Sequence, residues 1–239
     1  DAAPLLKAFR REGVTSGPIV EAMSAAKNGF GGVGTPGAVA LAVKLLVVQT
    51  RVLGFVGRAP TLRRETPAAT VHLVNFQRVV SGVTGREPGF TVNLNVVHGA
   101  LLRAWEATGH WSGKPPLASR VNVGVATRLG FLTEGRDVWW HPGTDAEAEQ
   151  VAGEVSAQLT TTGMNWLDHM TDPSTAIDEL LRGEIRRDID VAAALLAERP
   201  GDARRHTAVR VLTRSDPAPD TDERALRDWL LERLKSPGG

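Results

Sequence analysis

The chain of 239 residues is 42% hydrophobic and 23% charged, a composition that favours a globular protein with a sizeable core over a disordered or membrane protein. It contains no cysteine, which excludes disulfide bonds, thiolate chemistry and cysteine-based zinc sites and suits a reducing cytoplasm. The net charge of +1 is unevenly distributed, because residues 51–128 carry +7 and residues 129–239 carry −8. The basic region either attracts an anionic partner or packs against the acidic half of the chain.

Residues 1–58 are predicted to form an N-terminal helical segment. Short helices are expected at 4–12 and 17–28, followed by a flexible glycine-rich run at 29–37. That run contains the spacing G-x-G-x-x-G, but the segment before it has the pattern of a helix and not of a strand. We therefore expect a linker there and no nucleotide site.

The most apolar stretch of the chain, residues 36–57, is predicted to be a buried helix that ends near Gly54. It is interrupted by Lys44, Gln49 and Arg51. A membrane span of about 20 apolar residues would rarely carry so many polar groups, so we expect no membrane segment here.

The next part of the chain changes to the period of two that is typical of strands. Short connections containing Pro or Gly imply antiparallel neighbours. An excursion, either helical or irregular, is expected at 98–117, and a turn at Gly130–Gly135. Five strands are predicted, at 59–67, 70–80, 90–97, 118–129 and 136–140.

Helical patterns return after Trp140. Thr144 and Glu147 have the spacing of a capping box, and Asp172 followed by Pro173 is a second helix start signal. Helices are predicted at 145–161, 173–182, 184–198, 202–214 and 221–235. Together these elements predict an α+β fold: an antiparallel sheet of about five strands with N-terminal helices and a C-terminal helical extension. The predicted segments are 1–58, 59–170 and 171–239.

Four amide side chains lie two residues apart on two predicted strands. If those strands are hairpin neighbours, the amides share one face of the sheet and can hydrogen-bond across it. Such amides face water, form a structural ladder or line a binding surface. The four residues are Asn75, Gln77, Asn93 and Asn95.

Side chains suited to contact with a partner accompany these amides. In a strand at 136–140, Trp139 and Trp140 point to opposite faces, so one ring enters the core while the other is a contact anchor or is covered by the helix at 145–161. The candidate binding residues therefore include the two tryptophans and the arginines Arg63, Arg64 and Arg128.

The six histidines are dispersed, and none has the spacing of a metal site, so we expect no metal and no cofactor. Asp137 and His141 flank the tryptophan pair, a spacing that can orient an imidazole for base catalysis. With His98, they are the alternative catalytic candidates. No G-x-S-x-G motif or paired-carboxylate signature accompanies them, which favours structural or solvent-facing histidines.

Several short motifs in fixed order resemble a known family. VNFQ at 74–77, FTVNLNV at 90–96, RLGFL at 128–132 and GRDVWW at 135–140 are similar to the bacterial domain of unknown function 4304 family, over about residues 51–170. The resemblance implies a single α+β domain with a C-terminal helical extension. It implies no chemistry, because no activity is assigned to that family.

The sequence is therefore interpreted as a non-enzymatic bacterial protein of the cytoplasm with an interaction or regulatory role, for example an immunity-like role. We expect its partner to be another protein. Two alternatives stay open: a hydrolase that acts on an anionic substrate, and nucleic-acid binding through the basic 51–128 region. The oligomeric state is not predicted.

Overall fold

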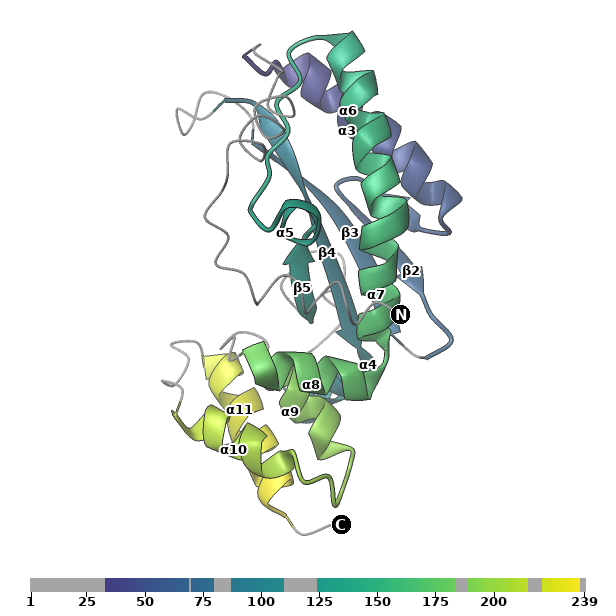
Figure 1. The fold of residues 1–239 in the computed structure, drawn as a ribbon. Coiled ribbons are helices and arrows are strands. Elements are labelled where there is room, and N and C mark those ends of the chain that lie inside the picture. The colour runs from purple at the N-terminus through teal and green to yellow at the C-terminus, as the bar shows by residue number, and fades with distance from the viewer. Residues whose placement is uncertain are drawn as a thin grey trace, which may run out of the picture.

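A computed structural model describes residues 33–68, 70–79, 87–109, 124–183, 189–214 and 221–236. They form an α+β fold in which a five-stranded antiparallel sheet carries helices on one face and further helices at one end (Figure 1). The predicted fold class is confirmed. The helices predicted at 4–12 and 17–28 lie outside the described residues.

The sheet is a meander in which every strand is antiparallel to its neighbour along the chain. The first two strands form a short hairpin, so the single strand predicted at 59–67 is the turn and second strand of that hairpin. The strands are β1 (Val56–Arg58), β2 (Thr61–Glu65), β3 (Thr70–Val79), β4 (Gly89–His98) and β5 (Val125–Arg128).

Helices α3 (Pro36–Val52) and α6 (Asp145–Gln158) lie side by side across one face of the sheet (Figure 1). Thr35 caps α3 by accepting a hydrogen bond from the amide N–H of Ala38 at 3.3 Å. The predicted capping box of α6 is present: Thr144 accepts from the N–H of Glu147, and the Glu147 carboxylate accepts from the N–H of Thr144.

Helix α6 continues without a break into α7 (Met164–Thr171) through a π-helical turn, Leu159–Gly163. Gly163 allows close packing at this turn, because a Cβ there would lie 2.9 Å from Leu159 and 3.4 Å from Leu94 of β4. The continuous helix formed by α6, the π turn and α7, here called the helical rod, therefore contacts α3 through α6 and the sheet through α7.

Two predictions for residues 129–140 are wrong. The predicted turn at Gly130–Gly135 is a short helix, α5 (Leu129–Glu134), which ends at Gly135 in the left-handed conformation. The predicted strand at 136–140 is an extended segment in which Trp140 makes an isolated bridge to Phe90, because α5 carries the chain away from the edge of β5. The excursion after β4 begins with α4 (Gly99–Ala107).

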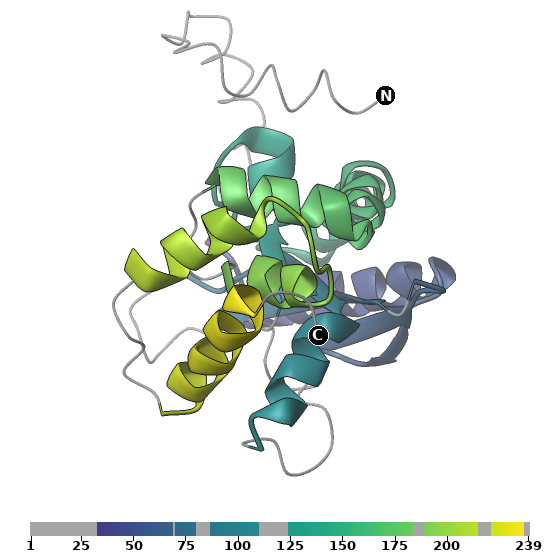
Figure 2. The same cartoon turned by 90° about the horizontal axis from the view of Figure 1, so that it is seen from below.

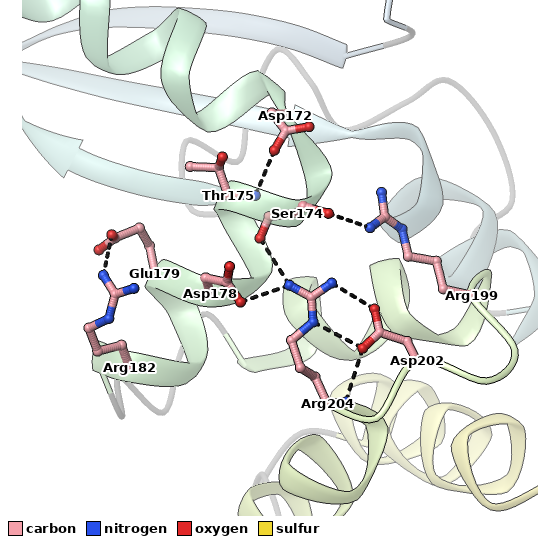
Figure 3. A network of polar contacts seen from close by, with 9 residues as sticks. All are labelled: Asp172, Ser174, Thr175, Asp178, Glu179, Arg182, Arg199, Asp202 and Arg204. Atoms are coloured by element: carbon pink, nitrogen blue, oxygen red, sulfur yellow. Dashed lines mark hydrogen bonds and ion pairs between the residues drawn. The ribbon is translucent and has the colours of Figure 1, made fainter. Parts of the chain in front are cut away.

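The C-terminal helices gather at one end of the sheet, as the view from that end shows (Figure 2). They are α8 (Pro173–Gly183), α9 (Ile189–Ala197), α10 (Arg205–Arg214) and α11 (Thr221–Lys235). Asp172 caps α8 as predicted, accepting from the N–H of Thr175 at 2.7 Å. The guanidinium of Arg204 joins Asp178 of α8 to Asp202 in the turn before α10 (Figure 3).

One hydrophobic cluster runs through the helices on the sheet, the sheet face beneath them and the C-terminal helices. Described residues from each of the three predicted segments thus belong to one core. From the sheet it takes Leu62, Val74, Phe76, Val92, Leu94 and Val96, which all point to one side. Among the described helices, none is long and apolar enough to cross a membrane.

Candidate functional site

The sheet face that points away from α3 and α6 carries the predicted amides. The register pairs Asn75 with Asn93, and Asn93 with Arg128 on β5. Because paired residues of an antiparallel ladder point to the same side, and because side chains alternate along a strand, Gln77 and Asn95 lie on that face too. We call this surface the polar face.

Side-chain hydrogen bonds run across four strands of the polar face. Arg128 Nε donates to Asn93 Oδ1 at 3.2 Å, and Asn93 Nδ2 donates to Asn75 Oδ1 at 3.1 Å. Asn93 Nδ2 also donates to Gln77 Oε1 at 3.2 Å. Asn75 Nδ2 then donates to Thr61 Oγ1 of β2 at 2.8 Å. The sequence contains no signal for Thr61, which becomes part of the network through the strand register alone.

The direction of this network is fixed by the arginine. A guanidinium only donates, so the atom of Asn93 that faces Arg128 must be the oxygen, and its NH₂ group must face Asn75 and Gln77. Both of those residues then show their oxygens to Asn93. The NH₂ group of the exposed Gln77 is left directed away from the network, as a donor.

Arg128 also connects the amides to the segment after α5. Its guanidinium forms an ion pair with Asp137, and the same carboxylate accepts from the indole Nε1 of Trp139 at 3.3 Å. The guanidinium carbon lies 5.6 Å from the centre of the Trp139 ring, within the range of a cation–π contact. Asp137 and Trp139 are therefore held at the edge of the polar face.

Burial changes along the polar face. Thr91 and Asn95 are fully buried, and Asn75 is 8% exposed. Asn93 is half-buried, whereas Gln77 and Arg63 are exposed. A buried amide must be hydrogen-bonded, so the network is structural at Asn75 and accessible to a partner at Gln77.

A cleft lies beyond Gln77, at the end of β3. It has a volume of about 350 Å³ and is lined by Val79, Glu87, Trp139 and His141. Val79 follows Gln77 by two residues and so belongs to the polar face. Trp139 is shared between the cleft and Arg128, which makes the two features one continuous surface.

His141 is fixed in place beside this cleft. Its Nδ1 lies 2.9 Å from the carbonyl oxygen of Pro88, which only accepts, so Nδ1 carries a proton and donates it to that oxygen. A Cβ at Gly89 would lie 2.6 Å from the ring, and one at Gly34 would lie 2.3 Å from the Pro88 oxygen. Gly34 is buried, so this end of the predicted flexible run is packed.

Arg64 lies on the opposite face from Arg63 and belongs to a different cluster. Its guanidinium donates to Nδ1 of the buried His72 at 3.0 Å and to Asp168 of α7 at 2.8 Å. His72 Nε2 lies 2.6 Å from the Thr171 hydroxyl, which itself donates to the Leu167 carbonyl. Thr171 thus accepts from Nε2, and His72 is neutral.

Burial is the main cause that lowers the pKa of His72 to about 4, and the charge of Arg64 lowers it further. His98, 1% exposed on the same side of the sheet, also has its pKa lowered by burial. Both histidines pack against the end of α7 and are structural in this arrangement.

The alternative catalytic residues are not brought together by the contacts of the described residues. Asp137 is engaged by Arg128 and Trp139, His141 by the Pro88 carbonyl, and His98 lies in the interior. Trp140 enters the core side, where its ring stacks on Phe90 with 5.4 Å between the centres. Within the described ranges, no group of three His, Asp or Glu residues is arranged to hold a metal ion.

Comparison with protein-family models matches residues 49–169 to a family described as Domain of unknown function (DUF4304). This segment is half of the sequence and contains the whole sheet, the polar face and the cleft. The chain belongs to this family. The resemblance expected over residues 51–170 is confirmed, and the DUF4304 match ends within α7, so α8–α11 lie outside it. No curated protein and no solved structure matched the chain.

Proposed function

We propose that the protein is a non-enzymatic binding domain that recognises another protein through the exposed end of the polar face. The observation that carries this proposal is the fixed direction of the hydrogen-bond network. It leaves the NH₂ group of Gln77 at the surface as a donor, and Arg63 is a second exposed donor on the same face of the sheet. A partner segment that presents backbone carbonyls or carboxylates complements such donors.

The geometry favours binding over hydrolysis. A nucleophile or general base must reach its partner within about 3 Å, and Asp137, His141 and His98 are each engaged elsewhere. By contrast, Trp139 is half-buried beside an arginine at the rim of a cleft, which is the setting in which tryptophan anchors protein interfaces.

The proposal includes a regulatory or immunity-like role in the bacterial cytoplasm. Its support is the cysteine-free sequence, which suits a reducing compartment. Such a role requires a tight and specific partner and no chemical step.

The test is site-specific photo-crosslinking in the native cell. A photoreactive amino acid replaces Gln77, and in a matched control it replaces Gln150 on α6, an exposed glutamine with one amide hydrogen bond to Glu154 at 3.0 Å. We expect one discrete protein adduct from position 77 that is missing from position 150. Binding should weaken less with added salt than nucleic-acid binding does, because the amide and aromatic contacts release no counterions.

Three results would contradict the proposal. Adducts of equal yield from both positions would indicate non-specific contact. The absence of an adduct at position 77 would show that this end of the polar face does not contact a partner protein. Recovery of nucleic acid that dissociates at modest salt would instead support the nucleic-acid alternative, through the exposed Arg58 and Arg63.

A further inference from the structure

The cleft beside the polar face contains hydrogen-bond acceptors and no available donor among its described lining residues. Glu87 is exposed, and no described hydrogen bond or ion pair engages its carboxylate. Nδ1 of His141 donates to the Pro88 carbonyl, so the tautomer that fits this contact has an unprotonated Nε2 that can accept a hydrogen bond. The indole N–H of Trp139, the one other polar group, donates to Asp137.

The charges around the cleft also favour a positively charged ligand. The nearby carboxylate of Asp137 is neutralised by Arg128, whereas Glu87 has no such counter-ion in the described chain. An aromatic ring attracts cations to both of its faces, and the Trp139 ring already holds the guanidinium of Arg128 at 5.6 Å from its centre. The described lining residues therefore favour a ligand that brings positive charge and N–H donors, which distinguishes them from the donor-rich surface at Gln77.

The remaining described lining residue, Val79, indicates the shape of the ligand. Val79 is an apolar side chain at the end of β3, and it can pack against methylene groups. An ammonium group directs three N–H bonds to different sides, so it can serve Glu87 and His141 together. A guanidinium instead presents its donors in one plane.

We propose that this cleft binds a primary ammonium on an aliphatic stem, namely a lysine side chain of the docked partner. The inference rests on the proposed function for the presence of a partner. The chemical class of the ligand follows from Glu87, His141, Trp139 and Val79 alone.

A titration without any partner tests this inference. The intact protein, labelled with ¹⁵N, is titrated with Nα-acetyl-lysine methylamide, and the indole N–H of Trp139 and the backbone N–H of Gly89 are followed by NMR. We expect saturable shifts that are missing with the uncharged norleucine analogue. Glu87→Gln should weaken binding about tenfold, as expected for the loss of a charge-assisted hydrogen bond.

The matched control is Glu65→Gln, at an exposed carboxylate on the same face of the sheet, which should leave the affinity unchanged. Equal binding of the norleucine analogue, equal binding by Glu87→Gln, or no saturable shift in the wild-type protein would each overturn the inference. Stronger binding of the arginine analogue would overturn the assignment to an ammonium. Because no partner is present, these results are independent of whether position 77 forms a crosslink.

Discussion

Asn93 is the residue that holds the polar face together, because it contacts Arg128, Asn75 and Gln77. We expect Asn93→Ala to lower the free energy of unfolding by about 1–3 kcal/mol, since it leaves the buried oxygen of Asn75 without a donor. Urea denaturation measures this change. The control Gln77→Ala should cost less than about 1 kcal/mol, because Gln77 is exposed. Equal losses would show that the network does not depend on Asn93.

His72 makes stability depend on pH. In the unfolded chain its pKa is 6.5, whereas in the folded protein it is lowered to about 4. Between these values the unfolded state binds more protons, so stability is complete above pH 6.5 and falls as the pH drops toward 4, by at most about 3 kcal/mol. His98 acts in the same direction.

The variant His72→Gln tests this assignment, because glutamine can still accept from Arg64 and donate to Thr171 but does not titrate. The decrease in the free energy of unfolding between pH 6.5 and 4, measured by urea denaturation at each pH, should become smaller. The same replacement at the exposed His206 is the control. An unchanged pH profile in His72→Gln would assign the acid sensitivity to other groups.

At the residue scale, the sequence predicted which side chains share a face but not what they do there. The period of two places Asn75 and Gln77 together regardless of register. The hydrogen-bond direction depends on Arg128 lying opposite Asn93, and that pairing joins residues 35 positions apart. The burial of His72 and His98 was also not predictable, since it results from α7 packing over them.

At the scale of the elements, local sequence signals predicted the starts of α6 and α8 correctly but predicted the wrong secondary structure around α5. The caps at Thr144 and Asp172 act within one turn, so the sequence reveals them directly. The segment 136–140 has strand composition, but α5 redirects the chain so that Trp140 alone reaches Phe90. The hairpin of β1 was missed because its three residues are too short for a periodic pattern.

Helix α11 depends on a cap that comes from α10. The buried guanidinium of Arg205 donates to the carbonyl oxygens of Arg233, Leu234 and Ser236 at the end of α11. We expect Arg205→Met to lower the free energy of unfolding by about 2–3 kcal/mol. Hydrogen exchange should show the loss first in the last turn of α11. The exposed Arg210, replaced in the same way, should leave exchange unchanged.

The start of α3 is fixed by a glycine rather than by its cap alone. Gly34→Ala brings a Cβ to 2.3 Å from the Pro88 oxygen, so we expect a loss of about 1–3 kcal/mol in the free energy of unfolding and a displaced His141. Gly37→Ala, in the first turn of α3, meets nothing within 4 Å and should stabilise the helix by up to about 1 kcal/mol. Thermal melting measures both effects. Equal effects of the two substitutions would contradict the close contact between Gly34 and the Pro88 carbonyl.

For the whole molecule, the question is how the helices outside the DUF4304 match are held to the sheet. Arg204 connects α8 to the turn before α10, and burial of Ile189 and Leu196 places α9 in the common core. We expect Arg204→Met to increase hydrogen exchange in α8 and α10 while leaving β3 and β4 protected. Loss of protection in the strands as well would mean that the molecule unfolds as one unit.

The family match and the continuous core describe different boundaries. The match begins inside α3 and ends inside α7, yet both helices bury side chains in the same cluster as the C-terminal helices. Boundaries based on sequence similarity follow the segment that relatives share. The hydrophobic core instead includes every apolar side chain that is buried in the fold, inside or outside the family match.

The π-helical turn between α6 and α7 has a consequence for the cluster around His72. A π turn adds one residue to a helix and so rotates all later residues by about 100° relative to an uninterrupted α-helix. Asp168 and Thr171 lie after it, and their phase on the rod brings them to Arg64 and His72. Deleting one residue from 160–162 would turn both away. The chemistry of the buried histidine is therefore set by the number of residues in a distant turn as much as by its own neighbours.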